Sequence, residues 1–433
     1  MRKKKNAFTL IELLAVIVIL AVILVISIPR ILDVIETSKK DSFKNAAQLI
    51  ADSAEKKKAS NKLLDKDEEI TCKDVAKIND EDYASCIISF DSDGIAKVSI
   101  TGRGKFDGLK ITNGTKENAE VKEITKPTYG MKATEYITNL LEYDGEGLKK
   151  DNTPDQNIRY YGSDPNNYVK FNNELWRIIG VFGNNVKLVR KDSLGSLSWD
   201  SSDSTINNGN GINQWGESTD ADGNEYAGAD LKNYLNTMYY GGTSVTCYNG
   251  QNNQTTTCPT GTIDEPSKGL IDYHIWNTGA IEYETTTDTI KFYKAERGRL
   301  NGKICSSGSP CNDTIIRTTT WTGYIGLPYA TDYAYASGEN ICETNMQAQD
   351  SSNAYVCKNN NWIYQKSDIR IISSIPNLYT ALYVWVVSEI GSIQNANASE
   401  THSIFPTLYL KSDILIESGN GTSSNPYTLK LNN

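Results

Sequence analysis

The chain begins with a basic stub, and the next 21 residues, 8–28, contain a single charged side chain, Glu12. About 20 apolar residues in a helix cross the hydrocarbon core of a bilayer, so this segment predicts a membrane-spanning helix. The stub from Arg2 to Lys5 suits the cytoplasmic side of the membrane. A carboxylate inside a membrane span is costly and is normally retained because it meets a partner there. Glu12 is therefore the first candidate functional residue.

Two plainer interpretations of this segment are a secretory signal and a simple membrane anchor. A secretory signal has a shorter apolar region followed by small residues at a cleavage site, and Ser27–Arg30 is not such a site. A simple anchor explains the span and the basic stub, but it gives no reason for Glu12. The segment is better explained by a helix that assembles with other helices.

The basic stub, the run Phe8–Glu12, the long apolar helix and Pro29 together resemble the type IV pilin and pseudopilin superfamily. The resemblance implies that a prepilin peptidase cleaves between Ala7 and Phe8, removing residues 1–7. It also implies that the new amine of Phe8 is methylated and that Glu12 guides addition of the subunit to a filament. Ala7 stands where the family usually has glycine. The implied partners are the peptidase, other pilin subunits and an inner-membrane assembly platform.

Simple electrostatics agree with this resemblance. Once exposed, the ammonium of Phe8 is a charge at the membrane, and Glu12 of a neighbouring subunit could pair with it. Pairing would neutralise two charges that are otherwise costly to bury, and so would set the register between subunits.

Apolar residues continue at helical spacing beyond the span, at Ile28, Leu32, Ile35, Phe43, Ala46, Ile50 and Ala54. This periodicity predicts an amphipathic helix. Because it resumes directly after Pro29, the proline is expected to kink the helix rather than end it. We expect one assembly helix over 8–60, with its inner half in a filament core and its outer half packed on the protein's own sheet.

Residues 61–128 are predicted to form that sheet, with short strands at Ile87–Phe90, Ala96–Thr101 and Leu109–Thr112. The amino-acid composition changes after this segment: all seven Trp of the chain lie between Trp176 and Trp385. Residues 129–433 are therefore expected to form a large, loop-rich, mixed ectodomain whose Trp are mostly core, and the fold class is α+β. In this ectodomain we expect helices at Ala133–Leu141 and Ala229–Asn236, and strands at Tyr168–Phe171, Leu175–Phe182, Val186–Val189, Thr289–Tyr293, Tyr383–Val387, Leu408–Leu410 and Tyr427–Leu431.

The C-terminal module is similar to a domain of uncharacterised surface proteins from Firmicutes-like bacteria. The likeness rests on segments 175–180, 321–333, 361–364, 408–413 and 425–427. The module also resembles C-type-lectin-like folds, but this second likeness is weaker than the first. Neither implies a molecular role, because fold analogy does not establish sugar binding.

Cysteine usage indicates an oxidising location outside the cell. All eight cysteines follow the span and fall as sequence neighbours, at Cys72 and Cys86, Cys247 and Cys258, Cys305 and Cys311, and Cys342 and Cys357. An even number in an exported chain favours disulfides, although spacing does not determine their connectivity. Metal binding is disfavoured because C-x-x-C pairs are absent and the chain has two His.

Net charge and residue content disfavour some classes of partner and activity. The net charge is −9, which becomes −13 once the basic leader is removed, so nucleic acid is an unfavourable partner. A local basic patch could still form around Lys149, Lys150 and Arg159. With two His, a Ser-His or Cys-His nucleophile has little support, and no enzymatic activity is expected. No cofactor is expected either; the oxygen-rich segment Asp220–Glu225 suggests Ca²⁺ only weakly and is better explained as an Asp-Gly turn.

These observations predict a minor or tip subunit of a type IV pilus that displays an ectodomain for binding an unknown extracellular ligand. Its expected location is the cell membrane, as a single-pass protein with the C-terminal domain outside, and the pilus or cell surface after assembly. Two alternatives remain open. One is a pseudopilin of a type II-like secretion system, and the other is a membrane-anchored surface glycosidase, because a pair of catalytic carboxylates leaves no local sequence signature.

Overall fold

The computed structural model describes residues 10–66, 68–76, 81–143, 145, 147–201, 214–219, 223, 225–250, 253–281, 288–300, 303–304, 318–346, 351–364, 368–375 and 383–432. The chain divides into two compact units, one made of Met1–Lys126 with Glu142–Asp144 and the other of Pro127–Leu141 with Gly145–Asn433. A long N-terminal helix is followed by antiparallel sheets and shorter helices. The predicted α+β class is confirmed.

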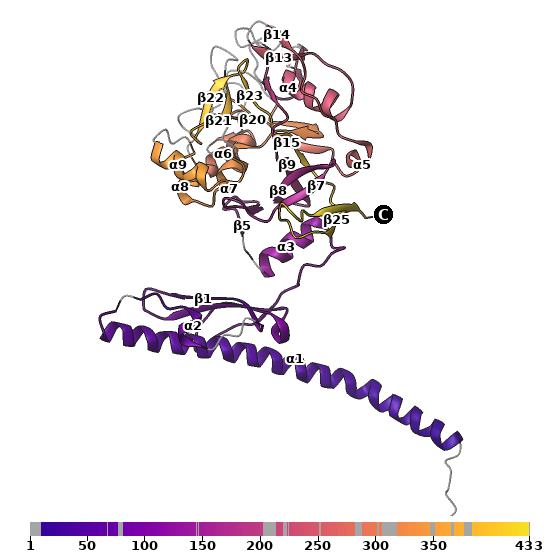
Figure 1. The fold of residues 1–433 in the computed structure, drawn as a ribbon, viewed down its shortest axis with the longest axis vertical. Coiled ribbons are helices and arrows are strands. Elements are labelled where there is room, and N and C mark those ends of the chain that lie inside the picture. Colours follow the sequence, from indigo (N-terminus) through magenta and orange to yellow (C-terminus); the bar gives the residue numbers. More distant parts are fainter. Residues whose placement is uncertain are drawn as a thin grey trace, which may run out of the picture. The chain divides into compact units, whose positions relative to one another are not determined.

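The first unit is built on α1 (Leu10–Leu63), a single helix of 54 residues. At 1.5 Å per residue it extends about 80 Å. The helix continues through Pro29 without ending, and Figure 1 shows it as one gently curved element. Continuous helix on both sides of the proline is what the uninterrupted apolar periodicity predicted.

Four antiparallel strands lie against the C-terminal half of α1 in chain order: β1 (Tyr83–Phe90), β2 (Ala96–Gly102), β3 (Leu109–Gly114) and β4 (Lys122–Glu123). The three predicted strands are confirmed. The β1–β2 turn forms because Asp91 accepts hydrogen bonds from the amides of Asp93 and Ile95. Gly94 follows in the left-handed region at φ 82°, which suits glycine.

The core of this unit forms where the inward-facing side chains of α1 pack against those of β2. Alternate residues of β2 turn inward, and every third or fourth residue of α1 does the same from Phe43 onward. The buried residues that meet in this way are Phe43, Ala47, Ile50, Ala51 and Ala54 of α1 and Ala96, Val98 and Ile100 of β2. The short helix α2 (Cys72–Val75) contributes Cys72 to the same cluster.

Two larger sheets organise the second unit. One has the order β19–β24–β9–β8–β6–β5, with β7 also paired to β8, and the other has the order β10–β23–β20–β21–β22. The bounds of the first are β5 (Leu148–Lys150), β6 (Ile158–Tyr160), β7 (Tyr168–Phe171), β8 (Glu174–Phe182), β9 (Asn185–Arg190), β19 (Ile325–Gly326) and β24 (Thr407–Tyr409). Those of the second are β10 (Ser196–Ser198), β20 (Ile369–Ser374), β21 (Tyr383–Val387), β22 (Ile393–Asn397) and β23 (Thr401–Ser403).

Five two-stranded pairs complete the strands that the structure describes: β11 (Ser218–Thr219) with β12 (Glu225–Tyr226), β13 (Cys247–Gly250) with β14 (Gln254–Thr256), β15 (His274–Asn277) with β18 (Thr320–Gly323), β16 (Arg299–Leu300) with β17 (Lys303–Ile304), and β25 (Ile414–Ser418) with β26 (Thr428–Leu431). The strands predicted at Tyr168–Phe171 and Tyr383–Val387 match β7 and β21 at both ends. The remaining predicted strands match within a few residues, apart from Thr289–Tyr293.

Short helices connect these strands: α3 (Ala133–Tyr143), α4 (Asp230–Asn233) continuing into a π-helical segment (Tyr234–Tyr240), α5 (Glu265–Lys268), α6 (Thr289–Glu296), α7 (Ala330–Ala336), α8 (Asn340–Thr344) and α9 (Ser351–Asn359). The strand prediction for Thr289–Tyr293 is wrong. Those β-branched and aromatic residues form α6, because Asp288 caps the helix by accepting a hydrogen bond from the amide of Lys291 at 2.8 Å.

Large aromatic side chains fill the core of the second unit. Trp176, Trp199, Trp215, Trp276 and Trp385 are at most 1% exposed, and Trp362 is 4% exposed. The prediction that most of the Trp are core residues is confirmed. Their burial leaves the polar side chains described below enclosed within an apolar shell.

Candidate assembly segment and buried charge network

The first half of α1 exposes its apolar side chains. Ile11 is 74% exposed, Ile19 58% and Ile35 57%, and deep burial begins only at Phe43. This helix is long and apolar enough to cross a membrane, and its most apolar part is not buried within the protein. A continuous apolar surface of this extent needs a bilayer or other subunits to cover it.

The residues predicted for processing and assembly occupy the start of this segment. The backbone of Glu12 is helical and lies in the first turn of α1. Pro29 lies within the helix and is exposed. Ala7 and Phe8 lie outside the residues that the structure describes.

Residues 2–28 match the family model described as the prokaryotic N-terminal methylation motif. Residues 2–28 are a type IV prepilin-like N-terminal segment. No curated protein and no solved structure matches the chain. The motif implies processing by a prepilin peptidase and assembly with other pilin subunits.

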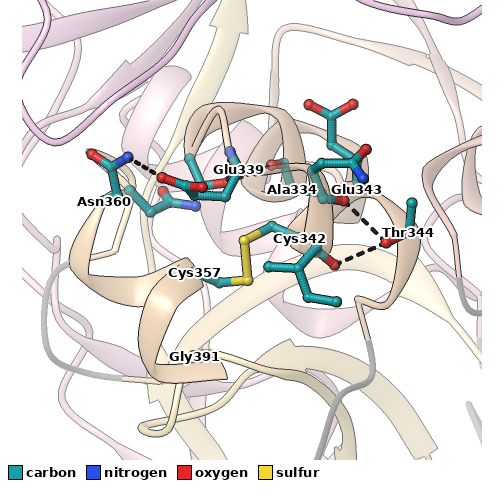
Figure 2. Close-up of a disulfide and its surroundings, with 12 residues drawn as sticks. Ala334, Glu339, Cys342, Glu343, Thr344, Cys357, Asn360 and Gly391 are labelled. Carbon is teal, nitrogen blue, oxygen red and sulfur yellow. Dashed lines mark hydrogen bonds between the residues drawn. A yellow bond between two sulfur atoms is a disulfide. The ribbon is translucent and has the colours of Figure 1, made fainter. Parts of the chain in front are cut away.

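Three disulfides join sequence neighbours within the described residues: Cys72–Cys86, Cys247–Cys258 and Cys342–Cys357. Cys305 and Cys311 lie outside them. Figure 2 shows Cys342 of α8 bonded to Cys357 of α9, with Glu339 accepting a hydrogen bond from Asn360 beside the bond. Closing a loop of 15 residues contributes about 3 kcal/mol in the chain-entropy model.

The alternative functions would need a metal site or a pair of catalytic carboxylates. In the described part of the chain, His, Cys, Asp and Glu side chains form no group of three or more suited to a metal ion. Asp220 and Asp222 of the weak calcium candidate lie outside it. Asp200 and Asp230 both accept a hydrogen bond from the amide of Ser201 at 2.8 Å. Burial and the nearby Asp230 raise the pKa of Asp200 well above its usual range, so the carboxyl group of Asp200 favours its protonated form.

A buried charge network, defined here as Asp151, Arg159, Lys187 and Asp332, lies in the core of the second unit. Its side chains are at most 3% exposed. Arg159 Nε donates to Asp151 Oδ2 at 2.9 Å, and Arg159 Nη1 donates to Asp332 Oδ1 at 2.6 Å. Lys187 Nζ donates to Asp332 Oδ2 at 2.5 Å. Two positive and two negative charges thus balance without solvent.

Local structure holds each member of this network in place. Arg159 and Lys187 project from β6 and β9 of the same sheet, and Asp332 lies in the first turn of α7. Asp332 Oδ2 also accepts from the amide of Tyr329 at 2.9 Å, which closes a capping box. Asp151 lies directly after β5 and accepts from the amides of residues 153 and 157.

The electrostatic effects follow from burial and pairing. Burial lowers the pKa of Lys187 to about 8, although Asp332 opposes the shift. Burial alone would raise the pKa of Asp332, but Lys187 and Arg159 outweigh it and hold that pKa below its usual range. Because removal of one partner leaves an uncompensated charge in a low-dielectric core, these residues depend on one another.

Sequence reasoning missed this network. The local sequence provides little warning, because the strand Asn185–Arg190 carries a cation at Lys187 and another at Arg190, and only the first is fully buried. The suggested basic patch around Lys149, Lys150 and Arg159 is wrong. Arg159 is buried between two aspartates, and Lys149 forms an ion pair with Glu343.

Glu296 of α6 lies next to the network and is fully buried. Its carboxylate accepts from the hydroxyl of Thr331 at 3.0 and 3.1 Å. Burial raises the pKa of Glu296 to about 7, while Arg297 opposes the shift. This carboxyl therefore loses its proton as the pH rises through about 7.

We expect Glu296→Gln to remove part of the pH dependence of stability. The pKa of Glu296 is higher in the folded than in the unfolded protein, so the folded state binds more protons between about pH 4.5 and 7, and wild-type stability falls as pH rises through that window. The glutamine keeps an acceptor for Thr331 but cannot ionise. Urea unfolding at several pH values should show the variant gaining on the order of 2–3 kcal/mol relative to wild type between pH 4.5 and 8. The exposed substitution Glu417→Gln should give a curve parallel to that of wild type, and a parallel curve for Glu296→Gln would contradict the assignment.

Proposed function

We propose that the chain is a non-enzymatic minor or tip subunit of a type IV pilus. Its N-terminal helix inserts in the membrane and assembles, and its second unit lies outside the cell and binds a ligand there. The observation that supports this proposal best is the match of residues 2–28 to the N-terminal methylation motif. The exposed apolar half of α1 adds a surface that a bilayer and then a filament core can cover in turn.

Size supports the minor or tip position. The second unit contains Gly145–Asn433 in addition to Pro127–Leu141, and a headgroup of that bulk is harder to repeat at every turn of a filament. Disulfides within it suit an oxidising, extracellular location. The acidic net charge of −9 disfavours nucleic acid as the ligand and leaves a host, matrix or neighbouring cell surface as the natural partner.

A pseudopilin of a type II-like secretion system is the second candidate, because the same methylation motif supports it equally. Genomic neighbours would distinguish the two, since a secretion channel accompanies a pseudopilin and a retraction motor accompanies a pilus. A surface glycosidase needs two facing carboxylates in an open cleft. The buried position of Asp200, which is 6% exposed, disfavours the pair it forms with Asp230.

The mass of the N-terminus tests this proposal. The protein should be recovered from cells that express a prepilin peptidase and digested, and its first peptide measured. We expect a methylated peptide that begins at Phe8. A peptide that begins at Met1 would mean that Ala7 blocks cleavage, and it would leave a surface domain on a simple membrane anchor.

A further inference from the structure

Lys187 and Asp332 meet inside an apolar enclosure. Both side chains are 0% exposed, and Lys187 Nζ lies 2.5 Å from Asp332 Oδ2. The aromatic rings around Nζ have centroids at 3.8 Å for Tyr329, 5.2 Å for Tyr409, and 5.4 Å for both Trp276 and Phe182. An amine and a carboxyl group are thus held in contact, away from bulk solvent.

The enclosure disfavours the charged form of Lys187. Two charges removed from water are costly, and their mutual attraction repays that cost only in part. Burial makes the ammonium of Lys187 more acidic than that of an exposed lysine. Burial raises the pKa of Glu296 to about 7, so below that pH it is mostly protonated and adds little negative charge that would hold Lys187 as the ammonium.

We propose that Lys187 and Asp332 condense into an intramolecular amide bond. The Nζ–Cγ bond forms and the Cγ–Oδ2 bond breaks. Two of the three ammonium protons pass to Oδ2, which leaves as water, and the third remains on the amide nitrogen. Atoms and charges balance without an oxidant, reductant or cofactor, because an ammonium and a carboxylate become a neutral amide and water.

Arg159 is placed to assist this step. Its Nη1 lies 2.6 Å from Asp332 Oδ1, the oxygen that remains as the amide carbonyl. As Nζ adds to Cγ, negative charge develops on Oδ1, and a fixed guanidinium at that distance stabilises it. Asp151 holds Arg159 from the other side at 2.9 Å. After condensation the Arg159–Asp151 pair remains charge-balanced, so no uncompensated charge is left in the core.

The bond joins two elements that lie far apart in the chain. Lys187 in β9 and Asp332 in α7 are separated by 145 residues. A covalent link between them would keep the core of the second unit closed when the chain is pulled.

Peptide mass spectrometry of the full-length wild-type protein tests the proposal. After reduction of the disulfides and digestion with trypsin, we expect a peptide containing Lys187 joined to one containing Asp332, lighter than their sum by one water. Trypsin should fail to cut after Lys187. Lys149, which pairs with the partly exposed Glu343, serves as an internal control and should be cleaved normally.

Each other outcome decides against the bond. Separate, unmodified Lys187 and Asp332 peptides would mean that the residues form only an ion pair. Cyclisation of Asp332 onto its own backbone loses the same water but leaves the two peptides separate, and that result would also overturn the proposal. Lys187→Arg, whose guanidinium is a poor nucleophile, and Asp332→Ala should both lack the linked peptide. The wild-type digest alone decides the question if either variant fails to fold.

Discussion

Substitution of Glu12 by alanine should nearly abolish incorporation into filaments while leaving membrane insertion intact. The apolar helix becomes more hydrophobic without the carboxylate, so insertion should not suffer. Assembly should suffer because the ammonium of Phe8 in a neighbouring subunit loses its counter-charge. Loss of one partner of a buried ion pair costs about 3–5 kcal/mol, which lowers incorporation by about a hundredfold or more. Immunoblots of sheared filaments and of the membrane fraction measure the two steps separately.

Two further substitutions separate charge from other effects. Glu12→Gln keeps the size of the side chain but not its charge, so it should show a similar loss. Asp52→Ala removes a carboxylate from the same helix, where it pairs with the exposed Lys56, and it should assemble normally. Normal incorporation of the Glu12→Ala variant into filaments would contradict the assembly role given to this residue.

Substitution of Asp151 by alanine should destabilise the second unit by about 3–5 kcal/mol. Its side chain is 0% exposed and accepts hydrogen bonds from the Thr153 hydroxyl at 2.6 Å and from Arg159 Nε at 2.9 Å. Alanine would remove the carboxylate that pairs with Arg159 Nε and would release the loop that Asp151 organises. Urea unfolding followed by tryptophan fluorescence measures the effect, since all seven Trp lie in this unit.

Asp155→Ala provides the matched control within the same loop. Asp155 pairs with Arg297 at 3.2 Å, but its side chain is 48% exposed. An exposed ion pair of this kind contributes about 0–1 kcal/mol, so this variant should unfold close to wild type. Equal and small effects of the two substitutions would contradict the importance given to the buried charge network.

The N-terminal helix and the strands that follow it were predictable because their signals are local. The apolar run over 8–28 and the periodicity through Phe43 and Ile50 depend on neighbours within a few residues. The strands β1, β2 and β3 are separated by short turns, so their pairing costs little chain entropy and follows chain order.

The same local reasoning was wrong at Thr289–Tyr293. Isoleucine, phenylalanine and tyrosine suit a strand by propensity. The segment is nevertheless helical, because Asp288 caps the helix and because Phe292 and Glu296 are buried on the inner side of α6. Tertiary packing outweighs propensity there, because propensities differ by only about 1 kcal/mol.

The sequence by itself determined the long N-terminal helix, the apolar segment 8–28 with Glu12 as its one charge, and the α+β class. These are properties of contiguous segments, and solvent or bilayer acts on them directly. Only the tertiary structure decided that Asp151, Arg159, Lys187 and Asp332 form one buried network. A charge survives in a low-dielectric core only beside its partner. The partners here come from β6, β9, α7 and the loop after β5, so their pairing exists only once those segments have folded together.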